Sequence, residues 1–335
     1  MTRHEAKVSS ARVDIKQREP ARYFPFANGR YEVKAGLHRF GADFGNGAAE
    51  GCVFQLDRQF DRFRSVKLAA RAEALQKYVL TDGYPDSAAQ AVTRFIAQRL
   101  ATEYPRWFAL SPDGGRWRLA CTLTGEDLTF DRHWQLEPQS SRIEVTPPYD
   151  SSLDALAGQI QEDLAVMSIQ NDRHKLAALH VCMPGHWAPT EKIGRTFAQI
   201  HAPVPQMQAI NARQQHYVHQ MVNAENGLVR FVWGCQSDDR LNGHPDAPHH
   251  NEEHSAGRAF DPGQTFLRME RQVIWGLSQA GAALFTIRPY LVAIREIRSV
   301  PELRRALISA LCSMEPDALA YKRLNRRDAL VDWLS

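Results

Sequence analysis

A histidine stands where a predicted helix ends, in the segment CMPGHWAPTEKIGRTFAQIHAPVP (residues 182–205). Pro189 suits the first turn of this helix, and Pro203 and Pro205 end it because proline lacks a backbone donor and restricts the residue before it. Residues at helical spacing share one apolar face: Ile193, Phe197, Ile200 and His201. A buried imidazole needs a partner. His201 is therefore either a hydrogen-bonded core or capping residue, or an axial ligand to haem iron in an apolar pocket.

An arginine in the middle of a predicted strand is the second candidate for chemistry. In GLVRFVWG (residues 227–234) the side chains alternate, so Arg230 shares a face with Leu228 and Val232. A guanidinium stays charged, and its burial requires an anion or a strong acceptor. Arg230 is either a structural ion-pair residue or a donor that stabilises negative charge developing on iron-bound dioxygen.

Three further arginines fall on two predicted neighbouring strands, in RMERQ (residues 268–272) and FTIRPYL (residues 285–291). Cross-strand ion pairs that involve Glu270 would account for Arg268, Arg271 and Arg288. Alternatively, some of these arginines bind the carboxylates of a cofactor, such as haem propionates.

Histidines and glutamates gather in HPDAPHHNEEH (residues 244–254), which could bind zinc or nickel. The segment lacks a helical HExxH frame and is rich in loop-forming residues, so a solvated loop is the alternative. The five cysteines form no CxxC pair, which argues against a cysteine-ligated iron–sulfur cluster, a zinc ribbon and a disulfide framework. A zinc hydrolase built on His244–His254 remains a rival function.

Nucleotide-binding motifs are absent from the sequence. GADFGNGAAEG (residues 41–51) has the wrong glycine order for a dinucleotide loop, and no Walker A motif occurs. A haem oxygenase would therefore need electrons from a partner protein.

The overall charge is balanced, with 41 basic and 38 acidic residues, and gives no case for nucleic acid or membrane binding. The polar N-terminus has no apolar core typical of a secretory signal. We expect a cytoplasmic protein.

The order of predicted elements favours an α+β fold. Helices are predicted at residues 62–79, 91–105 and 151–167, a hairpin at 116–136, and a strand at 177–183. Further strands are predicted at 227–234, 266–275 and 281–291, followed by a helix at 301–314. We expect residues 1–20 to form a mobile lead and residues 21–335 to form a single domain with an N-terminal helical portion and a C-terminal helix.

The sequence resembles the haem-dependent oxidative N-demethylase family, which includes the haem subunit of dimethylamine monooxygenase. The resemblance covers roughly residues 23–322 and rests on YFPFANGRYEVKAGL, FQLDRQFDRFRSVK, QEDLAVM, CMPGHWAPTEKIGRTFAQIHAPVP, VRFVWG, LRMERQ and GAALFTIRPYL. Two segments depart from the family pattern: GHW, where a Ser or Asn is expected near His186, and VIWGLSQAG, where a more basic run is expected.

The resemblance implies a PAS-like α+β domain that binds haem b through a histidine. It also implies dioxygen activation with NADPH-derived electrons from a separate reductase, conversion of small secondary methylamines to primary amines and formaldehyde, and tetrahydrofolate as formaldehyde acceptor. On this basis we assign His201 to the iron, Arg230 to catalysis, and the cofactor carboxylates to Arg268, Arg271, Arg288 and Lys192. His180, His186 and His219 are the alternative iron ligands. A haem-PAS gas or redox sensor is the rival function, although no output domain is recognisable in the sequence.

Overall fold

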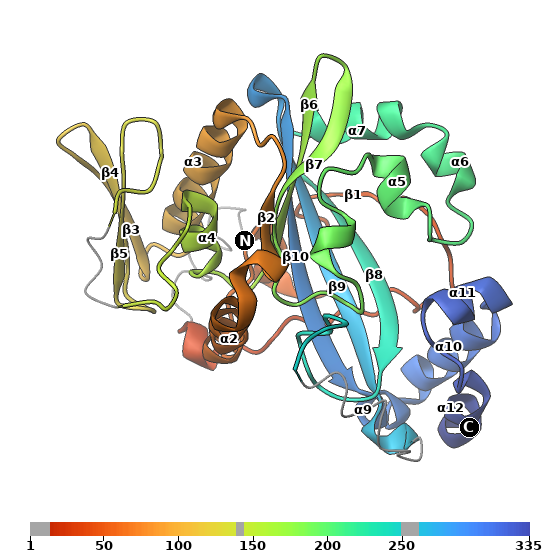
Figure 1. Cartoon of the computed structure of the whole chain (residues 1–335). Coiled ribbons are helices and arrows are strands. Elements are labelled where there is room, and N and C mark those ends of the chain that lie inside the picture. The colour runs from red at the N-terminus through yellow and green to blue at the C-terminus, as the bar shows by residue number, and fades with distance from the viewer. Residues whose placement is uncertain (1–13, 139–143, 249–260) are drawn as a thin grey trace.

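The computed structural model describes residues 14–138, 144–248 and 261–335. Within them, a central sheet of seven strands pairs antiparallel throughout (Figure 1). In spatial order its strands are β1 (His38–Arg39), β8 (Leu228–Gln236), β9 (Phe266–Leu277), β10 (Ala282–Ala293), β6 (Asp163–Gln170), β7 (Arg173–His180) and β2 (Val79–Thr81). A smaller sheet contains β3 (Phe108–Asp113), β4 (Arg116–Cys121) and β5 (Glu126–Phe130). The prediction of a fold with both helices and antiparallel sheet is confirmed. Its PAS-like arrangement stays a prediction.

Helices lie on both sides of the central sheet (Figure 1). They are α2 (Phe60–Tyr78), α3 (Asp86–Glu103), α4 (Ser152–Ala157), α5 (Phe197–His201), α6 (Gln208–Asn211), α7 (Gln214–Val222), α9 (Ile294–Arg298), α10 (Pro301–Cys312), α11 (Pro316–Tyr321) and α12 (Arg327–Leu334). Within the described part of the chain, no helix combines the length and apolarity that a bilayer crossing requires.

Alternation along the strands divides the sheet into two faces with separate cores. Met167, Ile274 and Ala283 pack with α5 and α7, and we call this side the α7 face. Val273 and Leu284 pack with α3 and α4 on the other side, which we call the α3 face. Because both faces are covered, the strands are nearly continuously buried.

The predicted helix at 151–167 is wrong beyond its first two turns. Helix α4 ends at Ala157, and the chain continues as strand β6 from Asp163. Lys67, fully buried on α2, donates to the carbonyls of Ala157, Ile160 and Glu162, so these carbonyls are satisfied without a helix. The apolar residues that mimic a helical face belong to different layers, with Leu164 on the α3 face and Met167 on the α7 face.

Other predicted elements are confirmed with shifted bounds. The hairpin corresponds to β4 and β5, the three later strands to β8, β9 and β10, and the C-terminal helix to α10, which α11 and α12 follow. Of the predicted mobile lead, the structure describes residues 14–20, where Ile15 is 1% exposed and packs in the core beneath α3. The proposed domain division stays a prediction.

Gly276 of β9 lies where the backbone of the sheet contacts the backbone at the end of α7 and in the loop after it. Its N–H donates to the carbonyl of Ala224 at 3.0 Å, and a Cβ atom at this position would lie 2.4 Å from the carbonyl oxygen of Val222. Both neighbours are backbone, so they cannot move aside cheaply.

We therefore expect Gly276→Ala to lower the free energy of unfolding by about 1–3 kcal/mol, as in other overpacked interiors. Gly51→Ala is the matched control, because a Cβ atom there meets nothing within 4 Å. Chemical denaturation measures both variants, and equal stability of the two would contradict this account of the contact.

Candidate functional site

His201 lies on a helix much shorter than predicted. Instead of one helix from Pro189, the chain forms a single 3-10 turn at Pro189–Glu191, and α5 begins at Phe197. Between them, Gly194 donates to the carbonyl of Leu176, and the N–H of Leu176 donates to the carbonyl of Arg195. This pairing with β7, together with a φ of 73° at Gly194, breaks the helix. Thr196 and Gln199 then cap α5 reciprocally.

The imidazole of His201 has one nitrogen bonded and one left free. Its Nδ1 lies 2.8 Å from the carbonyl oxygen of Phe197, and because a carbonyl only accepts, Nδ1 holds the proton. Nε2 therefore presents a lone pair. The pKa of His201 is lowered to about 4, chiefly by burial; the Phe197 hydrogen bond opposes this effect, and the charges of Arg230 and Lys192 add to it. The ring is neutral at pH 7, as a metal ligand must be.

Arg230 lies on the α7 face of β8, opposite Gln272 of β9. Burial lowers its pKa, and the charge of Glu270 opposes this effect. Its Nε is closed off from solvent and has no hydrogen-bond partner among the described residues. Because a buried guanidinium N–H needs an acceptor, this atom is suited to a ligand that brings one.

Two lysines approach the same region. Lys192 donates from Nζ to the carbonyl of Ile200, the residue before His201, at 2.9 Å. Lys322 follows α11, and a Cβ atom on Gly234 of β8 would lie 3.6 Å from its Cδ. Burial lowers the pKa of both lysines, and the charge of Arg230 lowers that of Lys322 further. Sequence reasoning missed Lys322, because nothing in its surroundings in the chain marks it.

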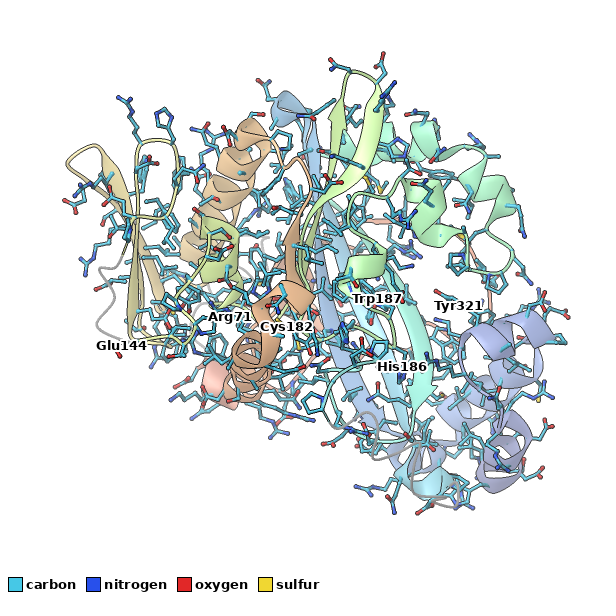
Figure 2. All side chains as sticks on the ribbon, in the orientation of Figure 1. Arg71, Glu144, Cys182, His186, Trp187 and Tyr321 are labelled. Carbon is cyan, nitrogen blue, oxygen red and sulfur yellow. The ribbon has the colours of Figure 1, made fainter. Side chains whose placement is uncertain are left out.

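His201, Arg230 and Lys322 belong to one electrostatically coupled cluster. The charge of Arg230 lowers the pKa of both His201 and Lys322, and each of the three side chains keeps some accessible surface. In Figure 2, Trp187 lies on the loop after β7 and Tyr321 at the end of α11.

The four predicted carboxylate-binding residues are divided between the two faces. Arg268 lies on the α7 face, but its Nη1 and Nη2 donate to the carbonyls of Leu241 and Met183 and its Nε to Glu270. Arg271 and Arg288 lie on the α3 face, away from His201.

On that face, the two arginines hold the chain's own N-terminal segment. Arg271 donates to the carbonyls of Cys52 and Val53, and Arg288 forms a 2.8 Å ion pair with Asp57. Of the predicted carboxylate-binding residues, therefore, only Lys192 has an amine near His201 that is not committed to a carboxylate or to several carbonyls.

The alternative histidines lie in other settings. His180 is fully buried, with Nε2 3.0 Å from Asp154 and Nδ1 3.9 Å from the sulfur of Cys182. His219 is exposed on α7, and His186 is half-buried at a φ of 66°. In the histidine-rich loop, His244 accepts from the N–H of Asp246, whereas residues 249–254 lie outside the described part of the chain.

The low pKa of His201 has a measurable consequence. Between pH 6.5, its ordinary pKa in the unfolded chain, and about pH 4, only the unfolded state binds a proton there. The ligand-free protein therefore loses stability as the pH falls through this window, by up to about 1.4 kcal/mol per pH unit.

We expect His201→Phe to remove this part of the pH dependence, as measured by denaturant unfolding at pH 4.5 and 7.5. The imidazole itself should titrate near pH 4 by ¹⁵N NMR. A pKa near 6.5 would show that the ring is not buried as described.

A comparison with known families identifies the family of the chain. A family model described as haem-dependent oxidative N-demethylase, alpha subunit-like, matches residues 50–331. The match includes Lys192, His201, Arg230 and Lys322, and it extends over most of the 335 residues. It confirms the resemblance inferred from the sequence motifs. The chain belongs to the haem-dependent oxidative N-demethylase, alpha subunit-like family.

Proposed function

We propose that this protein catalyses the oxidative N-demethylation of a small secondary methylamine such as dimethylamine. The amine, dioxygen, NADPH and a proton give a primary amine, formaldehyde, NADP⁺ and water. One oxygen atom enters formaldehyde and the other enters water. The observation that supports this best is the neutral His201, which feels the charge of Arg230; among the described residues neither its Nε2 nor the Nε of Arg230 has a hydrogen-bond partner.

The residues of this cluster fit haem b. His201 offers the unprotonated nitrogen that a haem iron takes, in the tautomer fixed by the Phe197 carbonyl. Lys192, whose charge acts on His201, and Lys322, whose charge is coupled to that of Arg230, are cations that suit propionate groups. When bound, haem would supply the reductive activation of dioxygen and the oxidation of the N-methyl carbon.

The chain's own residues would prepare the site for this chemistry. The hydrogen bond to Phe197 fixes the orientation of the imidazole. Arg230 holds a desolvated positive charge on a strand that is paired on β9 and cannot easily move. Such a preorganised donor stabilises negative charge that develops during dioxygen reduction at little reorganisation cost.

Electrons would come from a separate reductase that oxidises NADPH. The words "alpha subunit-like" in the family description support a partner, and the sequence offers no nucleotide-binding motif of its own. Tetrahydrofolate as formaldehyde acceptor and a cytoplasmic location stay predictions. Amine-dependent formaldehyde production with a reductase would separate this enzyme from a haem sensor, and a Soret band would exclude the zinc hydrolase.

We expect His201→Ala to abolish the Soret band, because we assign its unprotonated Nε2 to the iron. Circular dichroism should remain that of the wild type. His219→Ala is the matched control, since His219 is exposed on α7, and it should keep its full haem content. Undiminished haem in His201→Ala would redirect the search to His186.

We expect Arg230→Leu to keep its haem content and melting temperature while turnover falls about 100-fold, the effect of losing a donor aimed at developing charge. Arg230 has no ion pair among the described residues whose loss would cost stability. Arg173→Leu, an exposed change on β7, should leave both turnover and melting temperature unchanged. Early melting of Arg230→Leu with normal turnover by the folded fraction would make Arg230 a structural residue.

A further inference from the structure

Three side chains of the kinds that bind metals converge in the interior next to α2. Asp163 begins β6, His180 ends β7, and Cys182 follows two residues later. Each of the three is 0% exposed. A carboxylate oxygen of Asp163, a ring nitrogen of His180 and the sulfur of Cys182 all lie within 4.8 Å of one another. Cys182 packs against α2, where Figure 2 shows it.

This cluster lies apart from the residues assigned to haem. Alternation places His180 on the α3 face of β7, because Ala178, two residues earlier, packs in the core of that face. His201 belongs to α5, which packs on the α7 face. A ligand bound at the cluster would therefore be independent of the proposed function.

Hydrogen bonds hold His180 in the state that a metal requires. Its Nε2 lies 3.0 Å from Oδ1 of Asp154, and Arg71 donates to both oxygens of that carboxylate at 2.8 Å. Burial raises the pKa of Asp154, but His180 and Arg71 outweigh this effect and keep the pKa below its ordinary value. Because an ionised carboxylate only accepts, Nε2 carries the proton, and the neutral ring directs the lone pair of Nδ1 towards the sulfur of Cys182, 3.9 Å away. A carboxylate behind a histidine ligand is the usual second neighbour of a protein-bound metal.

The carboxylate of Asp163 has spare acceptor capacity. Its oxygens accept the N–H groups of Cys182 and Met183 at 3.0 and 2.8 Å, and each oxygen keeps a further lone pair. The ammonium of Lys67 is used by the carbonyls of Ala157, Ile160 and Glu162. Burial raises the pKa of Asp163 and of Cys182, and the charge of Lys67 opposes this effect in both. Lys67 therefore favours the ionised forms, which are the forms that bind a metal.

We propose that Asp163, His180 and Cys182 bind one zinc ion. Carboxylate, imidazole and thiolate are the ligands that zinc takes in proteins. At the usual bond lengths, the ligand atoms of one tetrahedral zinc lie about 3.4–3.6 Å apart. The three atoms, already within 4.8 Å of one another, have little distance left to close.

The charges around such an ion balance. Binding breaks the S–H bond of Cys182 and forms a zinc–sulfur bond, and the proton is released to water. A divalent ion with one thiolate and one carboxylate is locally neutral, so its burial next to the charge of Lys67 costs little. The site is structural rather than catalytic, because its ligands are fully enclosed. It ties the start of β6 to the segment that continues from Cys182 towards α5.

The test uses haem-containing protein produced in zinc-supplemented medium, because an enclosed site is filled while the chain folds. Elemental analysis should find one zinc ion per chain. X-ray absorption at the zinc edge should show one sulfur ligand at about 2.3 Å, and haem iron does not interfere because it absorbs at another edge. Zinc held by residues 244–254 would show no sulfur ligand, since that segment contains no cysteine.

Cys182→Ser removes the sulfur and should weaken zinc binding at least about 100-fold, because even the loss of a residue behind a metal ligand costs about 10- to 100-fold. Dialysis against a graded zinc chelator measures this loss. Cys312→Ser, which changes an exposed cysteine, is the matched control and should keep its full zinc content. The wild-type absorption spectrum decides the question if Cys182→Ser folds poorly.

Absence of zinc from the wild type, or a zinc spectrum without sulfur, would overturn the assignment. A well-folded Cys182→Ser that keeps its zinc would do the same, and sulfur ligation of another metal in the wild type would overturn the choice of zinc.

Discussion

Strands β8, β9 and β10 are covered on both faces, and this constraint governs every charged side chain on them. Alternation sends neighbouring arginines to opposite sides, so each must find its own acceptor in the interior. On the α3 face Arg271 and Arg288 find backbone carbonyls and Asp57 in the segment before α2. On the α7 face Arg268 is satisfied. Among the described residues Arg271 and Arg230 each have a buried Nε without a partner, but Arg271 donates from both Nη atoms to carbonyls, whereas no hydrogen bond from Arg230 is seen.

The two faces therefore use the same residue type for different purposes. Arg288 and Arg271 anchor the N-terminal segment to the sheet, and removing either would leave buried carbonyls or a carboxylate without a donor. Arg230 sits beside groups that are each held in one state: a neutral His201 and a carboxylate at Glu270 fixed by two donors. Such an arrangement holds charges in place before a ligand arrives, which is the requirement for electrostatic preorganisation.

Much of this organisation was predictable from the sequence, because period-2 alternation identified β8, β9 and β10 and placed Arg230 on the correct face of β8. His201 was proposed as the iron ligand from its spacing and the prolines after it, and this role stays a prediction. The two helices that were predicted too long have a common cause, because in both places tertiary contacts override the helical pattern of the sequence. Lys67 satisfies the carbonyls after α4, so residues with helical spacing at 158–167 form a turn and a strand instead. Leu176 pairs with Gly194 and Arg195 and shortens the helix before His201.

The side chains of the candidate site come from segments far apart in the chain, and no local sequence window contains them. Lys192 and His201 precede β8, Glu270 lies on β9, and Lys322 follows α11. A site built from such distant segments has a high contact order, which slows its formation relative to local helices and hairpins. Lys322 joins the group only when the residue after α11 packs against Gly234 of β8. Cofactor capture is therefore expected to be a late event in folding, after the sheet has closed.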